Sequence, residues 1–165
     1  MAIVFKQINS NNLQQAHDLI LKGWLFAYSH ISKTELKKLV DKYFSEKKLA
    51  AYLKLACKGK AFFFGAFDGA ELVGVCIAKL VGKKAELASL YVEPKKLRAG
   101  IGSELINLLE KFLVENGVFT YFTFANKHNK IGINFYKKAG FVRAPEKDKD
   151  DEFEKKALVY LEKKL

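Results

Sequence analysis

Cysteine and proline are scarce in this chain: each occurs only 2 times in 165 residues. Cys57 and Cys76 stand outside any CxxC pair and outside any His/Cys cluster with the spacing of zinc ligands. We therefore expect no metal site and two buried, reduced thiols. A disulfide between the two stays open at this stage, because it depends on a geometry that the sequence does not contain.

Long hydrophobic runs are also absent. No apolar stretch approaches the ~18 residues of a membrane span, and residues 1–8 alternate apolar and polar side chains where a signal peptide has a hydrophobic block. We therefore expect a cytoplasmic protein with no membrane partner. Half of the residues are apolar, and there is no repeat, linker or low-complexity segment, so residues 1–165 are expected to form a single domain with a real core.

Negative charge is in the minority, and the formal net charge is +11. Most of the positive charge comes from lysines spread along the chain, which is typical of a solvated surface. An attraction to an anionic ligand is the second interpretation. No helix-turn-helix spacing, zinc finger or aromatic RNA-binding motif is present, so we expect no nucleic-acid partner, although a basic nucleic-acid-binding domain stays as an alternative.

Hydrophobic periodicity predicts an α+β domain. Turn residues between the second, third and fourth expected strands, including Asp68-Gly69, predict an antiparallel meander. Strands are expected at residues 3–8, 61–67, 72–78, 85–92, 118–125, 141–143 and 157–161. Helices are expected at residues 13–21, 32–43, 46–57, 100–116 and 129–139, with residues 23–32 as a loop or short helical region.

Residues 97–103, Leu-Arg-Ala-Gly-Ile-Gly-Ser, form a glycine-containing turn between an expected strand and an amphipathic helix. Such a turn leaves backbone N–H groups unpaired at the positive end of a helix dipole, which favours phosphate binding. Basic residues precede the glycines at Lys95, Lys96 and Arg98. Each hydrogen bond to a charged phosphate contributes roughly 1.5–3 kcal/mol, so this turn is a candidate pyrophosphate site.

The two common nucleotide motifs do not match this turn. No GxxxxGK[ST] string is present, and the third glycine of GxGxxG is replaced by Leu105. The strand before the turn also follows two meander strands, which is unlike the start of a dinucleotide-binding fold.

The turn and its flanks resemble a different motif. Residues 87–94, Leu-Ala-Ser-Leu-Tyr-Val-Glu-Pro, and residues 98–106, Arg-Ala-Gly-Ile-Gly-Ser-Glu-Leu-Ile, are similar to the acetyl-CoA-binding motif of GNAT-type N-acetyltransferases, which contains Gln/Arg-x-x-Gly-x-Gly/Ala. Residues 129–141, Asn-Lys-Ile-Gly-Ile-Asn-Phe-Tyr-Lys-Lys-Ala-Gly-Phe, resemble the second signature of this family. The Gln/Arg position falls on Leu97, and Arg98 is displaced by one residue.

The resemblance implies a mixed, mostly antiparallel central sheet flanked by helices. It also implies transfer of an acetyl group from the cosubstrate acetyl-CoA to a primary amine of a small molecule, polyamine or protein, by direct attack in a ternary complex. A homodimer is one oligomeric state found in such relatives. The resemblance also implies which residues bind the cofactor: Leu90, Tyr91, Val92, Leu97, Arg98, Ala99, Gly100, Ile101, Gly102, Ser103, Asn129 and Tyr136.

Two catalytic roles follow from the resemblance. Glu86 occupies the position of the catalytic glutamate in the histone-acetylating branch; the alternatives are a polar residue at the start of a strand and a water as the base. Tyr136 matches the tyrosine that protonates the leaving thiolate, or it is an aromatic side chain of the core. The backbone N–H of Val92, at a strand end where the family has a bulge, resembles the donor to the thioester carbonyl.

Three further interpretations stay open. The aromatic residues Trp24, Phe26 and Tyr28, with His30, line an acceptor pocket or close the core. The acidic residues within 146–154 attract a cationic acceptor or form a solvated, mobile loop. Because Leu97 replaces the family's Gln/Arg, a catalytically silent CoA-binding protein is the alternative to an active transferase.

Overall fold

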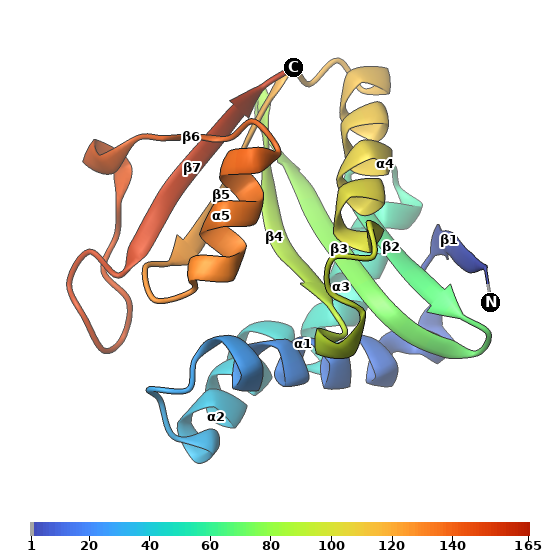
Figure 1. Ribbon diagram of the computed structural model, residues 1–165. Helices are drawn as coiled ribbons and strands as arrows, with labels where there is room; N and C mark the ends of the chain where they lie inside the picture. Colours follow the sequence, from blue (N-terminus) through green and yellow to red (C-terminus); the bar gives the residue numbers. More distant parts are fainter. Residues whose placement is uncertain (1) are drawn as a thin grey trace.

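A computed structural model describes residues 2–165. Its centre is a 7-stranded sheet with the order β1-β2-β3-β4-β5-β7-β6 (Figure 1). All neighbouring strands are antiparallel except β4 and β5. The strands are β1 (Ile3–Gln7), β2 (Ala61–Asp68), β3 (Glu71–Val81), β4 (Lys84–Val92), β5 (Thr120–Asn126), β6 (Val142–Arg143) and β7 (Leu158–Lys164).

Helices cover both faces of this sheet. Two clusters of buried apolar side chains lie between the sheet and these helices, one on each face. α1 (Leu13–Ala27), α2 (Lys33–Phe44) and α3 (Glu46–Cys57) pack on one face, and α4 (Ile101–Glu115) and α5 (Lys130–Lys138) pack on the other. The expected α+β fold with a mostly antiparallel sheet is therefore confirmed.

The parallel contact between β4 and β5 is short. It consists of two residue pairs, Ala85 with Tyr121 and Glu86 with Phe122. Beyond this junction the two strands separate, and Figure 1 shows them spreading apart toward α1. The sheet is thus split into two halves that are joined at one end.

The first helix is longer than its sequence pattern predicts. We expected helical residues at 13–21 and a loop or short helical region after Gly23, whereas α1 continues without interruption to Ala27. Position 23 has no room for a side chain, because a Cβ atom there would lie 2.4 Å from the Tyr91 ring on β4. This glycine lets the helix approach the sheet closely, so it does not mark a helix end.

The expectation of two buried thiols is wrong for one of them. Cys76 is buried in β3, but Cys57 is exposed because it ends α3 next to the Lys58–Gly59 turn, and both thiols are free. In the described residues 2–165, no helix combines the length and the hydropathy that a bilayer crossing requires.

The acidic segment before β7 is held by the fold. Asp148 is 8% exposed; its carboxylate accepts hydrogen bonds from the Arg143 guanidinium at 2.7 Å and from the Tyr160 backbone N–H at 2.9 Å. Burial opposes ionisation, but these hydrogen bonds and the guanidinium charge outweigh it and lower the pKa of Asp148. The segment is therefore folded onto β6 and β7.

Other carboxylates tie the same segment to distant elements. Glu152 pairs with Lys42 on α2. Glu154 pairs with Lys127 and with His128, whose Nε2 lies 2.8 Å away, in the turn between β5 and α5. Both glutamates are exposed, as a solvated loop requires, and each of them also has a cationic partner that is remote in sequence.

Replacing Asp148 tests the contribution of this buried carboxylate. Because the pKa of the folded state lies below the usual 3.8, ionised Asp148 stabilises the fold above that pH and loses this effect as the pH falls through the lower folded value. We expect Asp148→Asn to lower the free energy of unfolding by about 1–3 kcal/mol near neutral pH. The difference from wild type should shrink in urea titrations below about pH 3.8. Glu146→Gln, at an exposed position nearby, is the control; an equal loss in both variants would contradict the assignment.

Candidate functional site

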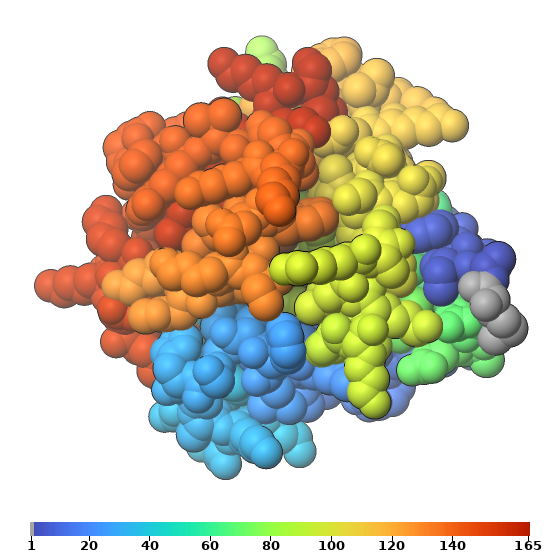
Figure 2. Space-filling model, in the orientation of Figure 1, coloured from blue at the N-terminus to red at the C-terminus, as the bar shows by residue number. Residues whose placement is uncertain are grey.

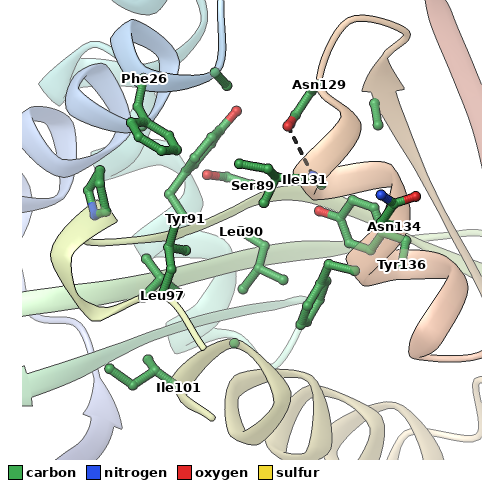
Figure 3. Close-up of a pocket in the computed structure, with 18 of the residues that line it drawn as sticks. Phe26, Ser89, Leu90, Tyr91, Leu97, Ile101, Asn129, Ile131, Asn134 and Tyr136 are labelled. Carbon is green, nitrogen blue, oxygen red and sulfur yellow. Dashed lines mark hydrogen bonds between the residues drawn. The ribbon is translucent and has the colours of Figure 1, made fainter. Parts of the chain in front are cut away.

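The gap between β4 and β5 contains a cavity of about 550 Å³. Its walls come from β4, β5, the end of α1, the turn before α4, the first residues of α4, and one side of α5 along its length. Figure 2 shows this face of the molecule, with the orange residues of α5 bordering the yellow-green turn above the blue end of α1. Figure 3 shows the side chains that line the cavity.

The β4 side of the cavity offers unpaired backbone groups. The Glu93 N–H donates to the Val73 carbonyl oxygen at 2.8 Å, and Val92 lies opposite Gly74. Because hydrogen-bonded and non-bonded pairs alternate along an antiparallel ladder, the N–H groups of Leu90 and Val92 point away from β3. They face the gap, where β5 is no longer paired. An acyl oxygen in the gap could accept from either of them.

A bulge in β4 decides which side chains face each side of the sheet. Ala88 has no partner on β3, since Leu87 pairs with Ala78 and Ser89 with Ile77. We expected a bulge at the strand end near Val92; the structure places it earlier in β4. The extra residue reverses the alternation, so that Leu90 and Val92 face α4 and Tyr91 faces α1.

The turn before α4 has the backbone geometry of an anion site. Gly100 has φ +82° and Arg98 has φ 66°. The first hydrogen bond of α4 runs from the Glu104 N–H to the Gly100 carbonyl oxygen at 3.0 Å, so the N–H groups of residues 101–103 have no helical partner. Gly100 has no side-chain cap, and these donors therefore point toward the cavity as the positive end of the helix dipole.

The basic residues beside this turn differ in what they contact. Lys96 pairs with Asp68 at 2.7 Å, and this contact raises the pKa of the lysine and lowers that of the aspartate. Lys96, Leu97 and Arg98 all line the cavity. Because the Lys96 ammonium is already paired with Asp68, Arg98 is the better placed of the two cations to compensate for the missing Gln/Arg side chain.

Tyr136 lies on α5 and faces the cavity. Its ring packs edge-on against Phe135 and Phe141, with centroid distances of 5.6 and 5.2 Å, and its hydroxyl points into the open space in Figure 3. Burial raises the pKa of Tyr136 above its usual value of 10.0. The phenol is therefore protonated at neutral pH, as an acid must be. The ring is thus part of the core, as one interpretation expected, while the hydroxyl reaches the cavity, and the acid role stays a prediction.

Asn129 begins α5. Its side-chain oxygen accepts a hydrogen bond from the Gly132 N–H at 3.0 Å, which is drawn as a dashed line in Figure 3. Gly132 fits closely here, because a Cβ at this position would lie 2.6 Å from the Asn129 amide nitrogen. Asn129 thus caps the helix and lines the cavity with the same side chain.

Glu86 is the predicted site residue that the structure places apart from the others. It lies at the β4–β5 junction, and its carboxylate is 3.7 Å from the Lys79 ammonium. It does not line the cavity, whereas every predicted cofactor-binding residue except Ala99 does. The base role of Glu86 therefore stays a prediction. Its carboxylate lies outside the cavity, whereas Tyr136, the predicted acid, lines it.

The aromatic residues of α1 divide between the core and the cavity. Trp24 packs on the cluster beneath α1, and its ring meets that of Tyr28 edge-on at 5.3 Å. Tyr28 and Phe26 line the cavity. His30 does not line the cavity; its ring lies 4.3 Å from that of His128.

Some lining residues carried no signal in the sequence. Ser89, Thr123 and Phe124 face the cavity only because β4 and β5 separate. The Thr123 hydroxyl donates to the Leu87 carbonyl oxygen at 2.9 Å, which satisfies a strand group that β5 no longer pairs. Phe135 had a signal in the Phe-Tyr pair of the second signature; its ring lies 3.2 Å from where a Cβ of Gly102 would be.

Comparisons with known proteins agree with this geometry. Residues 24–141 match the model of the Acetyltransferase (GNAT) family. A spermidine N(1)-acetyltransferase of Thermoplasma acidophilum is 27% identical over 143 residues, which are 86% of this chain and 89% of the relative.

Solved structures share the whole fold. The PaiA N-acetyltransferase of Thermoplasma acidophilum, in complex with coenzyme A, has a TM-score of 0.90, 24% identity and coverage of 100% of both chains. A GNAT-family acetyltransferase of Staphylococcus aureus has a TM-score of 0.79, 17% identity and coverage of 99% of both chains. Since the family model spans well over half of the sequence, this chain belongs to the GNAT family of acetyltransferases, which use acetyl-CoA to acetylate amines.

Proposed function

We propose that this acetyltransferase acetylates a primary amine of a polyamine by direct attack on acetyl-CoA in a ternary complex. The observation that carries the proposal is the cavity in the split sheet, with an anion-binding turn at one end and unpaired strand N–H groups beside it. These groups match two parts of the cosubstrate, its central pyrophosphate and its terminal thioester carbonyl.

The coenzyme is placed by backbone groups. The pyrophosphate binds the N–H groups at the start of α4, with Arg98 as a neighbouring cation. The pantetheine arm then extends between β4 and α5, where Asn129 lies. The thioester oxygen accepts from the N–H of Leu90 or Val92, and this contact strengthens as negative charge develops on the oxygen.

The bond changes are those of an acyl transfer. The amine nitrogen forms a bond to the carbonyl carbon, the carbon–sulfur bond breaks, the nitrogen loses a proton and the sulfur gains one. Tyr136 supplies the proton to the sulfur, since burial raises its pKa and keeps the phenol protonated.

A primary amine in its ammonium form must first lose one of its three protons before the attack, in addition to the proton that it loses as the carbon–nitrogen bond forms. An ordinary alkylammonium has a pKa near 10.4, so its deprotonation at pH 7 costs about 4.6 kcal/mol. Glu86 is paired with Lys79 outside the cavity. The geometry therefore favours water in the cavity over Glu86 as the acceptor of this proton.

Two observations support a polyamine as the acceptor. The Thermoplasma relative, 27% identical to this chain, is a spermidine acetyltransferase. The Asp151 carboxylate accepts a hydrogen bond from the Asn126 side chain at 3.1 Å, at the end of β5 next to Ala125, which lines the cavity. A carboxylate near this end provides a partner for the second ammonium group of a polyamine.

An amine panel with acetyl-CoA tests the proposal. Free thiol release and product mass would be followed for spermidine, a monoamine of similar length and a short peptide with a free α-amine. We expect the KM of spermidine to be at least about tenfold lower than that of the monoamine, because a second ammonium adds about 1.4 kcal/mol of binding. Preference for the peptide would contradict the polyamine acceptor. Acetyl-CoA binding without thiol release from any amine would instead favour the catalytically silent alternative.

A further inference from the structure

The hydroxyl of Ser89 is a buried polar group without a partner. The residue is 3% exposed, and its Oγ makes no hydrogen bond within residues 2–165. A buried hydroxyl in a native protein almost always has a partner, since its removal from water is otherwise uncompensated. Ser89 lines the cavity, so a molecule bound there can supply that partner.

The direction of this side chain is set by the bulge at Ala88. Without the extra residue, Ser89 would share a face with Ala85 and Leu87, which pack beneath α4. With it, Ser89 lies opposite Ile77, whose side chain belongs to the cluster on the α1 face. The hydroxyl therefore lies on the side of β4 opposite to α4, whose N-terminal turn is the proposed site of the pyrophosphate.

Other hydroxyl groups share this space. Tyr91 comes from the same face of β4, and Tyr28 approaches from the end of α1. Figure 3 shows Ser89 between Tyr91 and Ile131, with the Tyr136 hydroxyl directed toward the same space from α5. None of the residues that line the cavity within the described chain is Asp, Glu or His. The groups that can meet an acceptor nitrogen here are thus neutral hydroxyls, with the side-chain amides of Asn129 and Asn134 also on the cavity wall.

We propose that Ser89 Oγ binds the reacting nitrogen of the acceptor and, by accepting one of its N–H groups, makes the enzyme selective for primary amines. The inference rests on the proposed function. Leu90, the next residue, offers one of the N–H groups assigned to the thioester oxygen, so the hydroxyl is close to the carbonyl carbon. A nitrogen held there directs its lone pair toward that carbon.

The selectivity follows from counting N–H bonds. A neutral primary amine has two: one is donated to Ser89 Oγ, and the other is the proton lost to water as the carbon–nitrogen bond forms and Tyr136 protonates the sulfur. A neutral secondary amine has only one, which must be lost, so it has none left for Ser89. The serine neither gains nor loses a proton, and its role is to position the nitrogen.

Ser89→Ala tests this role against a structural one. Loss of one hydrogen bond to the amine should raise its KM about tenfold, equivalent to about 1.4 kcal/mol, while the KM of acetyl-CoA stays within about twofold of wild type. The ratio of kcat/KM for butylamine over N-methylbutylamine should fall by a similar factor. The melting temperature should stay equal or rise, because a buried hydroxyl without a partner is removed. A serine with a purely structural role would give a lower melting temperature and an unchanged ratio.

Ser29→Ala is the matched control, since Ser29 is exposed next to Tyr28 and does not line the cavity. Calorimetric titration of butylamine into the protein saturated with CoA gives a second readout that needs no turnover. If butylamine binds Ser89→Ala more weakly than wild type, the inference is supported, whether or not wild type transfers an acetyl group. A wild-type protein that transfers no acetyl group would refute only the proposed function. Equal amine affinity in both proteins, or an unchanged amine ratio in an active enzyme, overturns it.

Discussion

Gly100→Val is expected to abolish detectable acetyl-CoA binding while the protein stays folded. Gly100 has φ +82°, a left-handed conformation that β-branched residues avoid. Valine would shift the turn into another conformation and move the N–H groups of residues 101–103 off the phosphates. Losing two charge-assisted hydrogen bonds of about 1.5–3 kcal/mol each weakens binding by at least roughly 100-fold. Calorimetric titration with CoA measures this loss.

The matched control for this substitution is Gly59→Val. Gly59 has φ +71° at the end of α3, and, as at Gly100, nothing lies within 4 Å of the position of an added Cβ. Both substitutions therefore impose a similar backbone strain of about 1–2 kcal/mol without a steric clash. Only Gly100→Val should affect the coenzyme. If the affinity for CoA is unchanged in Gly100→Val, or falls equally in both variants, the turn is not the pyrophosphate site.

Tyr136→Phe is expected to lower kcat by about 100-fold or more, the range of a lost general acid, with the Kd of acetyl-CoA nearly unchanged. The ring packing against Phe135 and Phe141 is retained in phenylalanine. In wild type, burial raises the pKa of Tyr136 above 10.0. In the pH–rate profile of wild type, the decrease in activity caused by ionisation of Tyr136 should therefore begin only above about pH 10. This alkaline decrease should be missing from the profile of the variant.

Tyr121→Phe separates catalysis from the general effect of removing a buried phenol. Tyr121 is fully buried, and its hydroxyl donates to Glu110 at 2.6 Å, outside the cavity. We expect this variant to unfold more easily and to keep the wild-type kcat. Equal turnover in Tyr136→Phe and wild type would refute the acid role of Tyr136, and an equal decrease in both tyrosine variants would point to a loss of packing.

Local patterns in the sequence predicted most helix and strand positions and the glycine-containing turn before α4. Ser32 and Asn129 cap the helices that they were expected to begin. Gly100 adopts the left-handed conformation that a tight turn before a helix requires. Each of these features depends on residues within about one helical turn of one another, which is why spacing alone reveals them.

The errors have a common cause in long-range packing. Gly23 looked like the end of a helix, but it accommodates the Tyr91 ring, which comes from β4. The acidic segment is solvent-exposed at Glu152 and Glu154, as expected, but its pattern did not indicate that these two side chains pair with cations on α2 and in the turn after β5. The periodicity of residues within one segment contains no information about a contact with a residue that is distant in the chain.

By itself, the sequence determined the α+β class, the meander, the glycine-containing turn before α4, and the position of Tyr136 in the second signature. Only the tertiary structure decided that β4 and β5 part after two residue pairs, that the bulge at Ala88 places Ser89 on the α1 face of the sheet, and that Glu86 lies outside the cavity. The reason is physical: a turn or cap is stabilised by neighbours in sequence, whereas a gap in a sheet arises from hydrogen bonds between strands that are distant in the chain.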